Sequence, residues 1–166
     1  RPRAQPGRNL REEGLEVVLI NPSWSFLATP KTFPRRRLYQ ALGFAGVRSV
    51  SPVYTSLLRW RNPVDARNRE IFLVAVNPSD DVLAIPGVEA NRHLIRYPDV
   101  VLFDETSRPE FGPVAAAFRA GQRVTTEANQ HVVTVGGLFR LGTSFGVDGT
   151  IVASDVTYSR LFPGRS

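Results

Sequence analysis

The sequence predicts an α+β fold. Segments typical of strands and of helices both occur along the 166 residues, but they do not alternate regularly as they do in a doubly wound fold. Apolar residues make up 42% and charged residues 22% of the chain, as in an average soluble domain that buries a core. We expect a flexible leading segment over residues 1–14, followed by one domain over residues 15–166.

Short strands are expected first. Residues 1–13 are polar and rich in turn formers, which is typical of an irregular segment. Residues 15–20 (LEVVLI) are an apolar run closed by Asn21-Pro22 and predict a strand. Residues 23–28 (SWSFLA) predict a second short strand or a turn.

A helix is expected over residues 32–44. Thr32 is a suitable N-cap, and Pro34 lies in the first turn, where its missing N–H costs no hydrogen bond. Leu38 and Leu42 are four residues apart and predict an apolar face. The glycines that follow should end the helix.

A long hairpin is expected next. Residues 47–60 and 70–76 are rich in strand formers, and Asn62-Pro63 between them is typical of a turn. The tip of this hairpin carries several arginines.

Helices and strands are mixed in the second half of the chain. Residues 88–95 predict a short helix and residues 100–103 a strand. Ser107 and Glu110 fit a capping box, which predicts a helix that runs to Ala120 and ends at Gly121.

The C-terminal part predicts a hairpin, a strand and a helix. The hairpin comprises residues 123–127 and 131–141 and turns at residues 128–129. The last strand is expected over residues 150–153, and the helix over residues 154–161, before Pro163.

The positive charge is concentrated in one region. The chain carries a net charge of +6, and residues 31–69 contain 9 basic residues but one acid, Asp65. A local positive field attracts acidic proteins, nucleic acids or anionic lipids, although a solvated basic face is the plainer interpretation. Three consecutive arginines also stand at the positive end of the first predicted helix, where each costs roughly 0.3–1 kcal/mol unless an anion compensates it.

These observations give a hypothesis for a binding surface. We expect basic side chains of the first helix and of the hairpin tip to contact an acidic partner or lipid headgroups. Charge reversal in the helix should then weaken binding of the partner in a salt-dependent manner. The candidate contacts are Arg35, Arg36, Arg37, Arg59, Arg61, Arg67 and Arg69.

Few residues offer catalytic or metal chemistry. The chain has no cysteine and two histidines, which excludes thiolate and three-histidine metal sites, and we expect no metal, cofactor or catalytic residue. Residues 137–144 resemble a phosphate-binding loop, but Thr143 replaces the required lysine, so a strand is favoured. Asp104, Glu105 and Glu110 form a carboxylate group that would suit acid–base work, although helix capping explains it sufficiently.

Aromatic residues in the basic, N-terminal half of the chain raise the question of whether it binds nucleic acid. Trp24, Tyr54 and Trp60 lie among arginines, and such rings can stack on bases. No nucleic-acid-binding motif accompanies them, and core packing explains them more simply. We therefore expect no nucleic-acid partner.

Four segments together resemble DevC-type ABC-transporter permeases, which are relatives of the MacB and FtsX group. The resemblance runs in order from about residue 15 to residue 163. Its segments are FPRRRLYQAL (33–42), VRSVSPVY (47–54), VVLFDETSRPEFGPV (100–114) and VGGLFRLGTSFGVDGTIVASD (135–155).

The resemblance implies a non-catalytic periplasmic domain of an inner-membrane protein. The family domain has a mixed sheet, with a βαβ-like lobe and a mostly β lobe, and the first of these lobes is expected to be incomplete at the C-terminus here. It docks a periplasmic adaptor (membrane-fusion) protein, which joins a TolC-type outer-membrane channel. ATP hydrolysis takes place on a separate ATPase subunit, the permease is expected to dimerise, and DevC relatives export glycolipid. A chain without methionine fits an internal piece of such a permease.

Two alternatives stay open. The domain would itself bind an amphiphilic cargo if an apolar pocket lay beneath the hairpins. A basic nucleic-acid-binding module is the lesser alternative, and a steep salt dependence of DNA affinity would indicate it.

Overall fold

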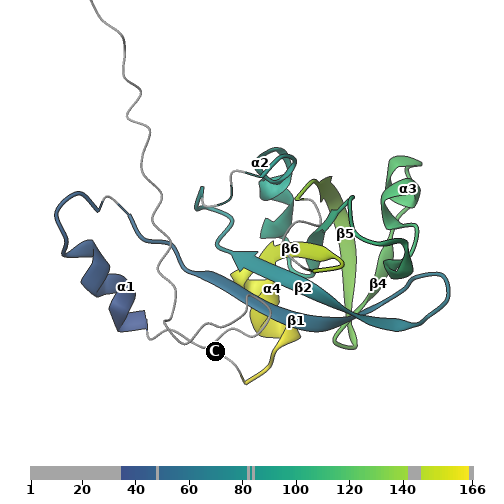
Figure 1. Ribbon diagram of the computed structural model, residues 1–166, viewed down its shortest axis with the longest axis horizontal. Helices are drawn as coiled ribbons and strands as arrows, with labels where there is room; N and C mark the ends of the chain where they lie inside the picture. Colours follow the sequence, from purple (N-terminus) through teal and green to yellow (C-terminus); the bar gives the residue numbers. More distant parts are fainter. Residues whose placement is uncertain (1–34, 48, 82, 84, 142–146, 165–166) are drawn as a thin grey trace, which may run out of the picture.

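Six strands form a closed barrel in the computed structural model, which describes residues 35–47, 49–81, 83, 85–141 and 147–164 (Figure 1). The strand order around the barrel is β1-β2-β6-β3-β5-β4. The strands are β1 (Val53–Arg61), β2 (Asn68–Val76), β3 (Val100–Asp104), β4 (Thr125–Ala128), β5 (His131–Phe139) and β6 (Thr150–Ser154). The helices are α1 (Arg35–Leu42), α2 (Val88–Asn91), α3 (Val114–Arg119) and α4 (Asp155–Leu161), with 3₁₀ turns η1 (Arg92–Arg96) and η2 (Pro109–Phe111).

The sheet is mixed, which confirms the predicted fold class. Strand β2 is parallel to β6, and β3 is parallel to β5, while the remaining neighbours are antiparallel. A parallel pair needs a crossover connection, and α3 lies within the connection from β3 to β5. The division into two lobes stays a prediction.

The long predicted hairpin is confirmed, although its first strand begins at Val53 and not at residue 47. Strands β1 and β2 pair over nine residues each, from Val53 opposite Val76 to Arg61 opposite Asn68. The buried Asn62 holds the loop between them: its Oδ1 accepts the backbone N–H of Val64 at 2.9 Å. The β1–β2 loop is therefore an ordered tip, as the Asn-Pro turn signal indicated.

Strand β1 pairs with its two neighbours over very unequal lengths. It pairs with β2 along its whole length but with β4 only where Trp60 lies opposite Ala128. The backbone of Arg59 exchanges hydrogen bonds with Asn129, at 2.9 and 2.8 Å, on the β4 side. Because strand residues alternate in direction, Thr55 and Leu57 direct their backbone groups to the same edge, where no described strand pairs with them.

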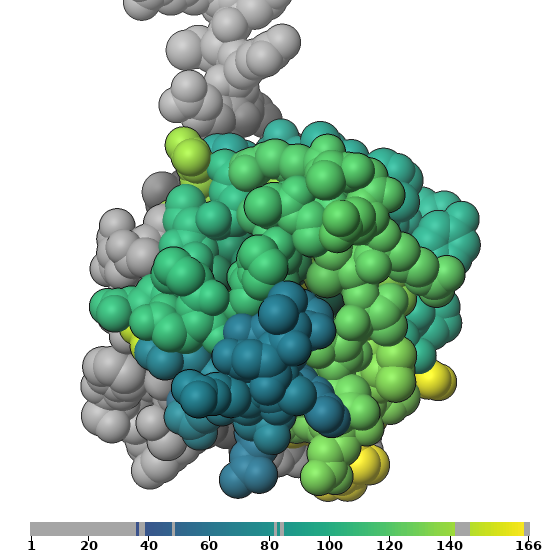
Figure 2. All heavy atoms as spheres, turned by 90° about the vertical axis from the view of Figure 1, so that its right-hand side faces the viewer, coloured from purple at the N-terminus to yellow at the C-terminus, as the bar shows by residue number. Residues whose placement is uncertain are grey.

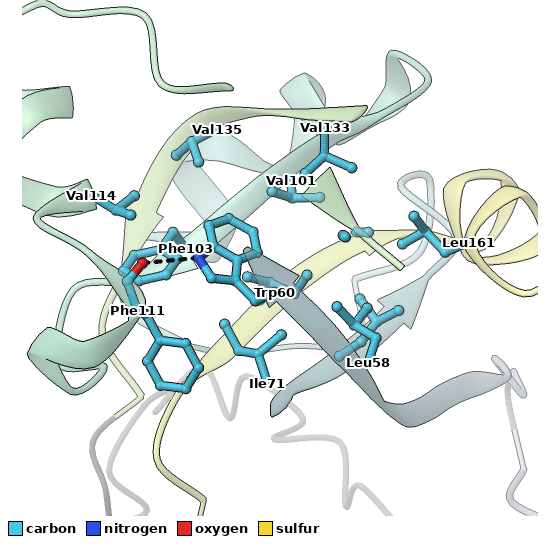
Figure 3. Packing of buried hydrophobic residues seen from close by; sticks show 14 of the residues in the cluster. Leu58, Trp60, Ile71, Val101, Phe103, Phe111, Val114, Val133, Val135 and Leu161 are labelled. Carbon is cyan, nitrogen blue, oxygen red and sulfur yellow. Dashed lines mark hydrogen bonds between the residues drawn. The ribbon is translucent and has the colours of Figure 1, made fainter. Parts of the chain in front are cut away.

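Apolar side chains fill the barrel, with Trp60 at the centre (Figure 3). Trp60 is fully buried, and its Nε1 donates a hydrogen bond to the carbonyl oxygen of Phe111 at 3.0 Å. The rings of Trp60 and Phe103 lie with their centroids 5.5 Å apart. A second, smaller apolar cluster that includes Val88 and Ile95 packs the α2–η1 segment against the sheet.

The C-terminal elements follow the sequence prediction closely. The side chain of Ser154 caps α4 by accepting the backbone N–H of Thr157 at 3.1 Å. The predicted turn of the second hairpin lies one residue later, at Asn129 and Gln130, which both have positive φ. Residues 137–139 belong to β5, as expected for a strand.

One element was predicted wrongly. The expected single helix after Ser107 is split into η2 and α3, because the chain turns at Gly112 (φ 103°). Ser107 forms no capping box, since its Oγ accepts the backbone N–H of Thr150 at 3.3 Å. The helix end was predicted correctly: Gly121 follows α3 with φ 78°.

The first helix is shorter than predicted. It spans Arg35–Leu42, and the backbone turns at Gly43, whereas the prediction extended to residue 44. The expected leading segment (1–14), the strands over residues 15–20 and 23–28 and the N-cap Thr32 lie outside the described residues.

Candidate interaction surface

The seven arginines predicted as partner contacts fall into two separate groups. The first turn of α1 holds Arg35, Arg36 and Arg37, and the helix has no acidic residue in that turn. The other four belong to β1, β2 and the loop between them. Figure 1 shows α1 beyond the Val53 end of β1, whereas the β1–β2 loop lies at the opposite end of that strand. The two groups are thus distinct candidate surfaces.

Arg59 and Arg61 lie on the outer face of β1, beside the seam with β4. Both are exposed, because alternate residues of the strand, Leu58 and Trp60, point into the core. Arg61 forms an ion pair with Glu127 of β4 at 3.3 Å, and its side chain remains 45% exposed. The structure gives Arg59 no ion pair with any residue that it describes, so Arg59 is the more available cation.

Arg67 and Arg69 also differ in whether they form an ion pair. Arg67 is an exposed residue of the β1–β2 loop, and its backbone N–H is held by the carboxylate of Asp65 at 2.9 Å. Figure 2 shows this loop, in blue, exposed on the end of the molecule between green segments. Arg67 also has no ion pair within the described part of the chain.

Arg69 is engaged inside the chain. It lies opposite Trp60, and its guanidinium stands 5.6 Å from the centre of the Phe111 ring. Its NH2 group contacts Asp148 at 2.7 Å, and Arg108 contacts the other oxygen of Asp148 at 2.9 Å. The hydrogen bond from Arg69 holds the pKa of Asp148 below its ordinary value and raises the pKa of Arg69. Arg69 thus links β2 to the segment before β6 and packs on a ring of the core.

The carboxylate group considered for acid–base work has structural partners. Asp104 is buried, and its Oδ1 accepts the backbone N–H and hydroxyl of Thr106 at 2.9 and 2.7 Å. Glu105 forms ion pairs with Arg119 and Arg140. Glu110 accepts a hydrogen bond from the Asn62 side chain through its backbone carbonyl. The helix-capping explanation for this group was wrong, because no side chain caps η2 and the Ser107 hydroxyl bonds to Thr150.

A polar cluster that the sequence did not indicate joins three elements. Asp99 accepts hydrogen bonds from His131 at 2.7 Å and from Arg160 at 2.8 Å, and so ties the start of β3 to β5 and α4. Partial burial raises the pKa of Asp99, but the hydrogen bonds from Arg160 and His131 outweigh it and lower the pKa below the ordinary value. The three residues are too far apart in sequence for a motif to show them.

The described residues offer little for a small ligand. They contain no cluster of three metal-ligating side chains. An open depression is lined by Pro86, Gly87, Glu105, Phe139 and Arg140, so charged groups border it. Among the helices that the structure describes, none has the length and apolar character that a bilayer crossing requires.

Comparisons with known proteins identify the fold. Neither a protein-family model nor a curated protein sequence matches the chain. The extracellular domain of the noncanonic ABC-type transporter YknZ from Gram-positive bacteria matches with a TM-score of 0.54 and 15% identity, covering 78% of this chain and 66% of that domain. The periplasmic region of MacB from Actinobacillus actinomycetemcomitans matches with a TM-score of 0.50 and 15% identity, covering 81% and 61%. The chain therefore shares their fold and spans less than two thirds of either structure.

Proposed function

We propose that this chain is the extracytoplasmic domain of an ABC-transporter permease. The observation that carries the proposal is the shared fold, which extends over 78% of the chain for YknZ and 81% for MacB. The four sequence segments that resemble DevC-type permeases point to the same assignment.

In this role the domain performs no chemistry and transmits motion. ATP hydrolysis on a separate subunit moves the membrane helices of a permease dimer, and the domain passes this movement to a periplasmic adaptor joined to a TolC-type channel. A barrel with a close-packed core suits the task, because a dense interior transmits displacement without deforming. The exported cargo is an amphiphile such as a glycolipid.

The β1–β2 end of the barrel is the proposed adaptor contact. Arg59 and Arg67 are exposed there and have no ion pair within the described residues, so an acidic partner surface meets cations that are free to pair. The internal pairs of Arg61 and Arg69 hold the strands on which this surface rests. An amphiphile-binding role for the domain itself is less well supported, because the depression at Glu105 and Arg140 has a charged border.

The reading frame on both sides of the chain tests the assignment first. An apolar span of about 20 residues upstream and three more downstream are expected for a permease. A frame that encodes a protein without such spans would refute the proposal.

Binding of the adaptor encoded beside the permease tests the contact surface. The double variant R59E/R67E should weaken binding at least about tenfold, mainly through slower association at low salt. The single variants R59E and R67E are compared with R96E, which makes the same change of charge at an exposed arginine of η1 and serves as the control. Affinities of R59E and R67E equal to that of R96E would contradict the proposed contact.

A further inference from the structure

The connection from α1 to β1 combines exposed apolar side chains with positive charge. Of the nine large apolar side chains that are exposed in the described residues, four lie within residues 39–47. They are Tyr39 (74% exposed), Leu42 (46%), Phe44 (71%) and Val47 (38%). The other five are spread singly over the remaining described residues, as is normal for a protein surface, so the concentration within residues 39–47 is unusual.

The same segment carries only one sign of charge. No aspartate or glutamate occurs from Lys31 to Val64, and three of the arginines in this stretch occupy the first turn of α1. Cations at the N-terminal end of a helix oppose the helix dipole, and nearby anions relieve that conflict. A complementary surface must therefore offer both negative charge and an apolar layer.

We infer that α1 binds the surface of an anionic lipid bilayer. A helix of eight residues is about 12 Å long and presents too little area for a stable protein interface, which buries about 800 Å² on each partner. A bilayer interface meets both needs, because aromatic side chains settle at the headgroup level while arginines reach the phosphates. The helix lies apart from the six strands (Figure 1), and the side chains of Tyr39 and Phe44 are more than 70% exposed.

This inference rests on the proposed function, because it places α1 at the membrane side of the domain and the β1–β2 loop at the adaptor side. The two arginine groups then have different partners: α1 contacts lipid phosphates, and Arg59 and Arg67 contact protein. The separation of the groups at opposite ends of β1 provides the geometry for this division (Figure 1).

Sedimentation with lipid vesicles tests the inference directly on the 166-residue chain. The chain should bind vesicles of phosphatidylcholine that contain phosphatidylglycerol, and bind vesicles of phosphatidylcholine alone much more weakly. Each arginine near an anionic surface contributes about fivefold, so the triple variant R35E/R36E/R37E should lose about 100-fold or more in affinity. The variant Y39A/F44A should lose about tenfold, because two apolar anchors are removed without a change of charge.

A control separates α1 from the overall charge of the protein. The triple variant R67E/R96E/R123E has the same net charge as R35E/R36E/R37E but changes exposed residues of the barrel. It should retain most of the vesicle binding, and circular dichroism should show that all variants remain folded.

Three results would overturn the inference: no binding to anionic vesicles, equal binding to neutral vesicles, or an equal loss in the control variant. A loss of adaptor affinity in R35E/R36E/R37E with unchanged vesicle binding would instead assign α1 to the protein partner. Failure of the vesicle experiment leaves the adaptor experiment with Arg59 and Arg67 unaffected, so the two proposals fail separately.

Discussion

Replacing Trp60 by phenylalanine should destabilise the barrel by about 2–4 kcal/mol. Trp60 is completely buried, and its Nε1 donates to the Phe111 carbonyl at 3.0 Å. Phenylalanine supplies no donor, and a buried carbonyl left without its hydrogen bond costs about 1–3 kcal/mol. The lost part of the indole adds a cavity term of about 1 kcal/mol.

Urea unfolding followed by far-UV circular dichroism measures this loss, because the signal does not depend on the indole that is removed. With a slope of about 2 kcal/mol per molar urea, the midpoint should fall by about 1–2 M. The variant Phe103→Leu is the control: it loosens the ring packing against Trp60 but keeps the hydrogen bond, and should cost about 1 kcal/mol. If W60F cost no more than F103L, the hydrogen bond to Phe111 would contribute nothing and our reasoning would be refuted.

Two further variants test other contacts. A Cβ at Gly149 would lie 2.5 Å from the Phe111 ring, which is fully buried, so G149A should destabilise by about 1–3 kcal/mol in the same assay; an unchanged midpoint would mean that the ring moves freely. Because the pKa of Asp99 is lowered in the folded state, its pairing with Arg160 and His131 stabilises above the unfolded pKa and is lost as the pH falls through the folded pKa. The stability difference between wild type and D99N should therefore shrink as the pH is lowered from about 5 toward 2, and a constant difference would contradict the assigned role.

Local elements were predictable because their signals lie close together in sequence. The Asn62-Pro63 turn between two runs of strand formers gave the hairpin, and Ser154 followed by Pro163 gave the limits of α4. The capping box at Ser107 failed because its hydroxyl bonds instead to the backbone of Thr150, 43 residues away. A sequence pattern carries no information about a competitor at that distance.

The candidate surface was predictable only as a concentration of charge. The number of arginines in residues 31–69 was visible, but not which of them are free. Arg61 pairs with an acid 66 residues away and Arg69 with an acid 79 residues away, and both pairs depend on how the barrel closes. Closure itself joins strands distant in sequence, and hydrophobic periodicity does not specify their order.

Strand β1 pairs with β4 at one position, Trp60 opposite Ala128. This affects how a partner that binds the remaining edge of β1 should be detected. Toward the Val53 end, Thr55 and Leu57 direct backbone groups to the edge, and no described strand pairs with them. The carbonyl of Leu57 accepts the Ser56 hydroxyl at 3.2 Å. An extended peptide that pairs there would be recognised through its main chain, largely independently of its sequence. Alanine scanning would overlook such an interaction, because it leaves the backbone intact. Amide hydrogen exchange at Thr55 and Leu57, compared with the β2-facing amides of Ser56 and Leu58, would detect it.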